Sequence, residues 1–232
     1  MTVTVDERTN YPFEETVRFN LTIKDRTDSV SFPVHLRIPT WCPNPEVRVN
    51  DQTISPTAVA NGIAIVNRTW KNGDVLMLEL PMPIRTSRWH ENAIAIERGP
   101  LVYALKVKER WEKKTFTGSD TIFGHHYFEV YPETPWNYGL PSFSSRDIPQ
   151  LFEVVKKENV DFNYPWNPEN APIEIKTKGR RIPHWQLYNG MAGPQPLSYI
   201  YQPEVETPEE EITLIPYGCT TLRISEFPVL NR

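Results

Sequence analysis

Apolar and polar residues alternate along much of the first part of the chain. Between residues 16 and 24, Val17, Phe19, Leu21 and Ile23 are separated by polar side chains, and residues 30–38 repeat the pattern. A period of two is typical of a strand with one buried face. Pro33 interrupts the second of these strands and has no backbone N–H, so we expect that strand at a sheet edge or at a bulge. Further short strands are predicted at residues 3–5, 46–50, 62–67 and 75–80. Short strands separated by turn residues predict a β-sandwich.

The stretch from Thr69 to Leu105 joins two β patterns through a short polar hinge. Residues 71–74, Lys-Asn-Gly-Asp, predict a turn, and the strand that follows should end where Pro81 and Pro83 remove two backbone donors. Two more strands are expected at residues 93–97 and 101–107, on either side of a bend at residues 98–100. The hinge at residues 86–92 divides the chain into predicted domains at residues 1–90 and 91–232.

The second half of the chain is less regular. We expect a strand at residues 127–131, a strand or helical turn at 151–155 and a strand at 173–177, with ordered loops at 132–139 and 162–172. Residues 178–181 predict a basic turn, residues 204–211 a solvated acidic loop, residues 212–215 and 220–224 a closing hairpin, and the tail from Phe227 a frayed end. No segment up to Leu105 has a helical period over ten residues. The fold class predicted is all-β, with two consecutive antiparallel, jelly-roll-like β-sandwiches and long ordered loops in the second.

Composition and charge narrow the classes of partner. The 232 residues include 23 Pro against only 10 Gly, and the net charge of −4 comes from acidic and basic residues that are mixed along the chain. A nucleic-acid partner is not expected, because no basic patch is visible, and neither is a membrane span, because no run approaches about 18 apolar residues. Residues 2–15 have neither the basic nor the apolar region of a signal peptide. Any export would be directed by residues outside this chain, and periplasmic and secreted locations stay open.

Residues that could carry chemistry give weak signals. His125, His126 and Glu129 are the first candidates for a metal site, but neighbouring strand residues point to opposite faces, so no metal site is predicted. Cys42 and Cys219 are far apart; we favour two buried thiols over one long-range disulfide. A glycosidase needs two carboxylates about 5 to 10 Å apart, a pairing that sequence cannot show. The favoured interpretation of the many acidic residues is a solvated surface.

Large aromatic residues gather in the loops rich in Pro, Asn and Gly. Those we single out as candidates for carbohydrate binding are Trp136, Tyr138, Trp166 and Trp185, and Trp111 and Tyr188 belong to the same set. Sugar rings stack their C–H faces on flat aromatic side chains, and loops often carry function. The alternative, which we favour, is that these rings fill an irregular core or an interface with another domain.

An ordered series of motifs resembles a known family. Residues 36–42 (LRIPTWC), 68–74 (RTWKNGD), 80–82 (LPM), 97–103 (ERGPLVY), 131–138 (YPETPWNY) and 215–223 (IPYGCTTLR) occur in the order seen in the C-terminal half of the β-L-arabinofuranosidase-like enzymes of glycoside hydrolase family 127. The resemblance covers nearly the whole chain. The series as a whole is more specific than any one of its pieces.

The resemblance implies that this chain and the catalytic site belong to different domains of a larger protein. Members of the family combine a helical-barrel catalytic domain, with a catalytic glutamate and a zinc-binding cysteine cluster, with a middle and a C-terminal β-sandwich. This chain resembles the two sandwiches. Cys42 and Cys219 do not match the cysteine cluster, so we expect no cofactor in this chain, zinc only in the barrel, and no catalytic residue here.

Three functions therefore remain in view. The first is a non-catalytic region that supports the catalytic barrel of the same parent protein and contacts arabinose-containing glycans. The second is a free carbohydrate-binding module that uses the loop aromatics, and the third is a hydrolase in its own right. We rank them in this order.

Overall fold

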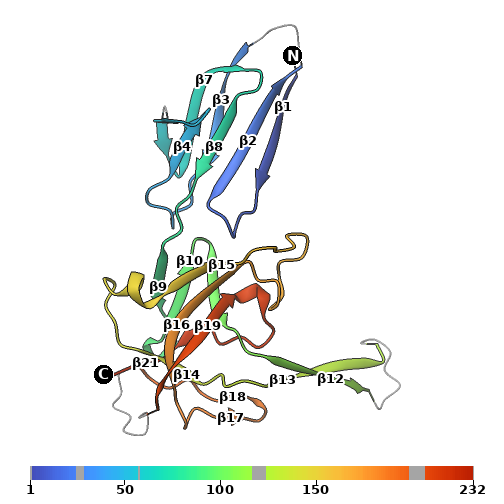
Figure 1. Ribbon diagram of the computed structural model, residues 1–232, viewed down its shortest axis with the longest axis vertical. Helices are drawn as coiled ribbons and strands as arrows, with labels where there is room; N and C mark the ends of the chain where they lie inside the picture. The colour runs from blue at the N-terminus through green and yellow to red at the C-terminus, as the bar shows by residue number, and fades with distance from the viewer. Residues whose placement is uncertain (1, 25–28, 57, 117–123, 199–206, 232) are drawn as a thin grey trace. The chain divides into compact units, whose positions relative to one another are not determined.

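The computed structural model describes residues 2–24, 29–56, 58–116, 124–198 and 207–231, which form two compact units (Figure 1). Unit 1 is residues 1–83 and unit 2 is residues 84–232. Strands dominate both units, and the one α-helix of the described residues is a single turn, α1 (Ile148–Leu151). The all-β prediction is confirmed.

Unit 1 contains two antiparallel sheets. Its strands are β1 (Val3–Thr9), β2 (Thr16–Ile23), β3 (Ser29–Arg37), β4 (Glu46–Val49), β5 (Gln52–Ile54), β6 (Ala58–Ala60), β7 (Ile63–Lys71) and β8 (Val75–Glu79). One sheet has the order β1-β2-β8-β4-β5 and the other the order β3-β7-β6. Pro33 lies on β3, which is an edge strand as predicted, so the missing N–H costs no ladder hydrogen bond.

The core of unit 1 is built from the inward-facing residues of both sheets. Val17 and Leu21 of β2, Leu36 of β3 and Leu76 of β8 belong to one buried cluster centred on Trp70. The Trp70 side chain is fully buried, and its indole N–H donates to the carbonyl oxygen of Phe32 at 2.9 Å. Burial of the large ring therefore leaves no polar group unpaired.

Unit 2 is organised around one nine-stranded sheet. Its strands are β9 (Ile84–Arg88), β10 (Ile94–Arg98), β11 (Leu101–Leu105), β14 (Tyr138–Pro141), β15 (Glu153–Lys156), β16 (Ile173–Arg181), β19 (Glu209–Pro216), β20 (Glu226–Phe227) and β21 (Val229–Leu230). The main path runs β20-β10-β11-β19-β16-β14-β21, with β9 paired to β10 and β15 paired to β16. The turns η1 (His90–Asn92) and η2 (Tyr217–Cys219) are short 3₁₀ helices.

Two separate hairpins complete unit 2. One is formed by β12 (Glu109–Thr115) and β13 (His126–Pro132), and it extends away from the nine-stranded sheet as a long ribbon (Figure 1). The other is formed by the two-residue strands β17 (Leu187–Tyr188) and β18 (Met191–Ala192).

Several local predictions for unit 2 were wrong. Residues 178–181 are not a turn, because β16 continues through Arg181 while pairing with β19 and β14. Glu209–Glu211, predicted as loop, begin β19, and residues 220–224 form no hairpin with it. The tail is not frayed, since Phe227 is fully buried beside β10 and Val229 pairs with Leu140 of β14.

The division between the units falls between Pro83 and Ile84, earlier than the expected end of the first domain at residue 90. The reason is β9, whose residues from Ile84 to Arg88 pair with β10 from Arg98 to Ile94. A strand that shares a ladder with β10 belongs to unit 2. The two prolines that end β8 therefore mark the division more closely than the polar hinge does.

Candidate functional site

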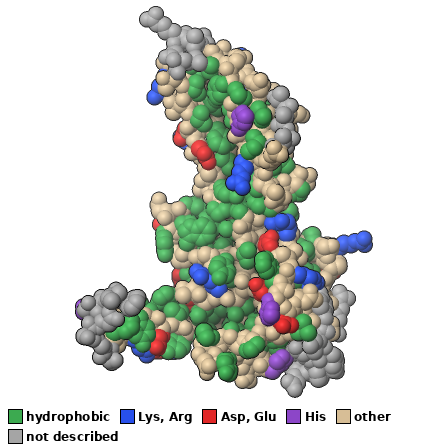
Figure 2. All heavy atoms as spheres, turned by 180° about the vertical axis from the view of Figure 1, so that it is seen from behind, with side chains coloured by type: hydrophobic (Ala, Val, Ile, Leu, Met, Phe, Trp, Pro, Cys, Tyr) green, Lys and Arg blue, Asp and Glu red, His purple; other side chains and the backbone are tan. Residues whose placement is uncertain are grey.

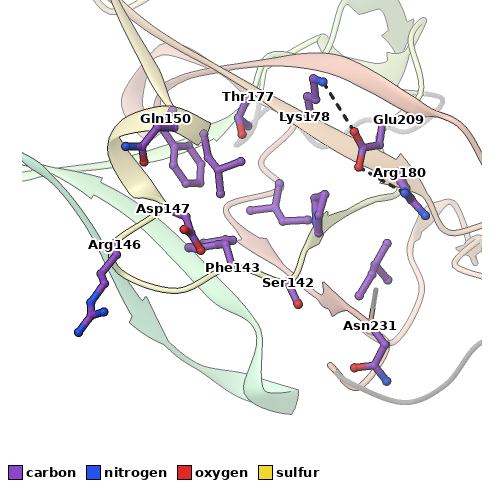
Figure 3. Close-up of a pocket in the computed structure, with 15 residues that line it drawn as sticks. Ser142, Phe143, Arg146, Asp147, Gln150, Thr177, Lys178, Arg180, Glu209 and Asn231 are labelled. Atoms are coloured by element: carbon purple, nitrogen blue, oxygen red, sulfur yellow. Dashed lines mark hydrogen bonds and ion pairs between the residues drawn. The ribbon is translucent and has the colours of Figure 1, made fainter.

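A pocket of about 780 Å³ lies in unit 2 beside β16 (Figure 3). One side is formed by the segment 142–152 that joins β14 to β15 and includes α1, and the other by β16, β19 and the end of the chain. Its lining residues are Leu140, Pro141, Ser142, Phe143, Arg146, Asp147, Gln150, Leu151, Phe152, Thr177, Lys178, Arg180, Glu209, Leu230 and Asn231.

The pairing of β16 explains why a cavity forms at this place. On one edge of β16, β15 pairs with the residues from Ile173 to Lys176, and β14 pairs with Arg180 and Arg181. The segment between β15 and β14 must therefore arch over the part of β16 that neither strand covers. Thr177 and Lys178 occupy this uncovered part and line the pocket.

Local interactions hold the arching segment in shape. The Asp147 carboxylate accepts hydrogen bonds from the Ser144 N–H at 2.8 Å and from the Ser144 hydroxyl at 2.9 Å. Gly139 lets β14 approach the C-terminal strand, because a Cβ there would lie 2.9 Å from a side-chain carbon of Leu230. The wall and the floor of the pocket are thus fixed by residues that are far apart in the sequence.

The two acidic side chains that line the pocket are each paired with another group of the protein. Glu209 pairs with Arg180 at 3.3 Å and with Lys178 at 3.8 Å, and Figure 3 shows both contacts at one side of the cavity. With Asp147 also hydrogen-bonded, both carboxylates of the lining are already engaged. The arrangement is better suited to binding a ligand than to proton transfer, which needs a carboxyl group aimed at the reacting bond.

The base of the pocket is apolar. Leu140, Phe152 and Leu230 are buried, and Phe143 packs edge to face on Phe152 with ring centroids 5.5 Å apart. Thr177 is only 7% exposed as a residue, but its hydroxyl oxygen is not among the buried side-chain atoms that lack a hydrogen-bond partner. The pocket therefore combines an aromatic floor with a threonine on its wall.

The four aromatic residues predicted to bind carbohydrate lie outside this pocket. Trp185 is 5% exposed, packs at right angles on Trp136, and donates its indole N–H to the carbonyl oxygen of Gly193 at 3.0 Å. Tyr138 is also buried and donates its hydroxyl to Glu210 at 2.7 Å. The rings of Trp136, Tyr138 and Trp185 pack against other residues of unit 2. This is the alternative to carbohydrate binding that we favoured from the sequence.

Trp166 is the exception among the four. Its side chain is 39% exposed, and one edge of the ring lies so close to Gly218 that a Cβ there would be 2.9 Å away. The surrounding loop is tied by Asn170, which donates to the carbonyl oxygens of Asp161 and Tyr164. Trp166 is thus a partly exposed ring on an ordered loop.

An exposed apolar groove of about 390 Å³ lies elsewhere on unit 2. It is lined by Trp89, Val102 and Tyr217, which are 59%, 38% and 43% exposed, together with Pro100 and Leu101. Figure 2 shows exposed hydrophobic side chains in several broad groups on one face of this unit. Groups of this kind are typical of surfaces that other protein segments cover.

The residues considered for metal binding and for disulfide formation form neither kind of site within the described part of the chain. Among the described residues no group of three or more His, Cys, Asp and Glu side chains could hold a metal ion. Cys42 and Cys219 are free and buried, one in each unit, as the favoured interpretation predicted. Burial raises the pKa of Cys219 to about 11. In the part of the chain that the structure describes, no helix is long and apolar enough to span a membrane.

Comparison with known proteins identifies the first unit. The family model of the GH127 middle domain of β-L-arabinofuranosidase matches residues 1–82, the same segment that folds as unit 1. Unit 1 therefore matches the GH127 middle domain along nearly its whole length. A search of curated proteins finds no match to the chain.

Solved structures extend the likeness to the GH127 proteins over the whole chain. A GH127 β-L-arabinofuranosidase from Geobacillus stearothermophilus T6 is 22% identical, with a TM-score of 0.59 over 99% of this chain. A protein described as a glycoside hydrolase is 25% identical, with a TM-score of 0.60 over 98%, and a GH127 β-arabinofuranosidase is 20% identical, with a TM-score of 0.59 over 99%. The chain spans 31% to 33% of these three proteins. The fold of this chain is therefore similar to about a third of each of these proteins.

Sequence reasoning missed the residues of the pocket. Thr177 was assigned to the end of a strand and Arg180 to a turn, and no site was predicted at Phe143. The one local signal is the spacing of Ser144 and Asp147, which permits the side-chain to backbone bond that shapes the loop. That signal predicts a turn, and it does not predict a cavity.

Proposed function

We propose that this chain is the non-catalytic β-rich region of a β-L-arabinofuranosidase-like glycoside hydrolase. One observation carries the proposal: a GH127 middle domain is followed by a unit whose fold continues the likeness, while the chain spans only a third of the solved relatives. The catalytic domain of the same parent protein is the proposed partner, and zinc, expected from the family resemblance, is proposed to bind there.

The apolar groove of unit 2 supports the proposed partnership. Trp89 exposes more than half of its side chain, and its indole N–H is already satisfied by the Ser87 hydroxyl at 2.8 Å. The ring therefore contributes apolar area without a polar group that needs solvent. We propose that the catalytic domain covers this groove, since buried aromatic rings contribute most to protein interfaces.

A Trp89→Ser substitution tests the docking surface. In this chain alone the free energy of unfolding should change by no more than about 0.5 kcal/mol, because the side chain is exposed. In the protein translated from the complete reading frame, the same change should lower the melting temperature and increase proteolysis between the domains. Differential scanning calorimetry and limited proteolysis measure both effects.

The control is Tyr188→Ser, which removes a side chain that is 68% exposed and lies outside the groove. It should be silent in both proteins. If Trp89→Ser is also silent in the longer protein, the groove is not where the catalytic domain binds.

Contact with arabinose-containing glycans is the second part of the proposal. Trp166 supports it, because an ordered loop presents the ring with more than a third of its surface exposed. The same residue supports the alternative of a carbohydrate-binding module. The binding experiment below includes Trp166 for this reason.

A further inference from the structure

Thr177 is a polar residue in an apolar setting. It lies on β16 between Lys176, which β15 covers, and Gly179, which packs beside β14. Only 7% of its surface is exposed, yet its hydroxyl oxygen is not among the buried atoms without a partner, and the residue lines the pocket. A hydroxyl can both donate and accept a hydrogen bond. A group that enters the pocket could therefore bond to this hydroxyl.

The charges around Thr177 select against a strongly charged ligand. The lining contains the basic residues Arg146, Lys178 and Arg180 and the acidic residues Asp147 and Glu209, and Glu209 pairs with Lys178 and Arg180. A free anion would meet two carboxylates, and a free cation would meet three basic side chains. A neutral ligand that both donates and accepts hydrogen bonds fits this mixture best.

The floor and the size of the pocket add a second requirement. Phe143 and Phe152 present aromatic carbon beside the buried Leu140 and Leu230, so one face of the ligand must be apolar. A sugar ring has this dual character, with C–H groups on one face and hydroxyls around its edge. The volume of about 780 Å³ lies within the range of roughly 300 to 1,000 Å³ that is usual for small-molecule sites.

We infer that this pocket of unit 2 binds a short neutral glycan. A ring of the glycan stacks on the Phe143 side, and one of its hydroxyls bonds to Thr177. The inference rests on the proposed function only for the sugar class, arabinose-containing glycans. It adds a binding site in the pocket, separate from the contact proposed at Trp166.

The inference is tested by titrating the full chain with neutral arabino-oligosaccharides. Binding is measured by calorimetry and by the shifts of backbone amide NMR signals. Binding should move the amide signals of Thr177 and Phe143. Thr177→Val keeps the shape of the side chain and removes the hydroxyl, and it should weaken binding by about fivefold or more, the loss of one hydrogen bond. Thr213→Val, on β19 and outside the pocket, is the matched control and should bind as the wild type does.

Phe143→Leu is the second variant, in case Thr177→Val fails to fold. It retains apolar bulk without the ring, and it too should weaken binding. Absence of binding at about 20 mM glycan would overturn the inference. So would tighter binding of inorganic phosphate or oligogalacturonate than of the neutral glycan, or binding that Trp166→Ala abolishes and Thr177→Val leaves unchanged.

The readout separates this inference from the proposed function. Binding is measured without turnover, so a chain that binds glycan and also hydrolyses it would refute the non-catalytic role and leave the pocket assignment standing. A chain that neither binds nor hydrolyses would refute the pocket assignment and the proposed glycan contact, and would leave the non-catalytic role standing.

Discussion

At the scale of single residues, the Lys71–Asp74 turn shows how one carboxylate fixes a sandwich corner. Asp74 accepts hydrogen bonds from the Lys71 N–H at 2.8 Å and from the Asn50 amide at 2.9 Å, while Gly73 takes the positive φ of 87° that the turn needs. Burial acts to raise the pKa of Asp74, but these hydrogen bonds and the nearby Arg68 and Lys71 lower it below its ordinary value. The turn therefore depends on an ionised aspartate.

Asp74→Asn should destabilise unit 1 by roughly 1 to 3 kcal/mol at neutral pH, because an amide places a donor where two donors already point. Since the folded pKa is lowered, the stabilisation is present above the unfolded pKa of about 3.9 and is lost as pH falls through the folded value. Urea unfolding between pH 7 and pH 3, followed by Trp fluorescence, should show a shallower pH dependence in the variant.

Asp51→Asn serves as the control for this measurement. Asp51 is exposed and has a φ of 63°, which Asn tolerates, so its replacement should change stability by no more than about 0.5 kcal/mol. Equal slopes in the wild type and Asp74→Asn would contradict the role given to the carboxylate.

At the scale of elements, the β12–β13 hairpin has two unlike faces. One face carries charged side chains that pair along the ribbon, including Lys114 with Glu112 and Glu129. The other carries Trp111 and Phe128, whose rings meet edge to face at 5.9 Å while each remains about half exposed. An isolated two-stranded ribbon is marginal in water, so its base must be anchored.

Glu109 provides that anchor. Its carboxylate accepts hydrogen bonds from the backbone N–H groups of Thr221 and Leu222, at 2.7 and 2.8 Å, and from the Thr220 hydroxyl at 2.9 Å. Burial acts to raise the pKa of Glu109, and these donors lower it overall. The hairpin is thereby joined to the segment that follows β19.

Glu109→Ala should cost roughly 1 to 3 kcal/mol by leaving the two backbone donors unpaired. Hydrogen exchange should quicken at the Thr221 and Leu222 amides. Glu112→Ala, which breaks only exposed ion pairs, should cost about 1 kcal/mol or less and leave those amides protected. Unchanged exchange at both amides in Glu109→Ala would show that the hairpin is held in another way.

The strands and turns also show which structural features can be predicted from sequence patterns. The alternation of β2, the turn at Gly73 and the bend at Gly99 and Pro100 were predicted correctly, because each depends on local chemistry. The continuation of β16 through Gly179 was missed. A Cβ at Gly179 would lie 3.3 Å from the Gly139 carbonyl oxygen, so this glycine permits close strand packing and makes no turn.

Other strands were not predicted because they depend on contacts between residues far apart in the sequence. The sequence of β12 is highly charged, and only the pairing with β13 places Lys114 beside Glu129 and Arg110 over the ring of Tyr131. The pairs Glu226–Phe227 and Val229–Leu230 are too short for a local strand signal, and they become strands only through β10 and β14. The pocket depends on the same pairings, so sequence could not place it.

At the scale of the whole molecule, two independent divisions of the chain agree. The family match ends at residue 82 and the first compact unit ends at Pro83, so the match and the unit cover the same segment. The chain as a whole is similar in fold to solved structures with which it shares 20% to 25% sequence identity. We propose that these units support a catalytic domain and bind glycan, and that bond cleavage takes place in that other domain.

The measurement that tests this account most directly is hydrolysis of p-nitrophenyl β-L-arabinofuranoside by the purified chain, with and without added Zn²⁺. The Geobacillus stearothermophilus β-L-arabinofuranosidase, one of the structural relatives, serves as the positive control. The account predicts that this chain releases no p-nitrophenol above the buffer rate in either condition. Turnover that follows the purified chain through successive columns would contradict it.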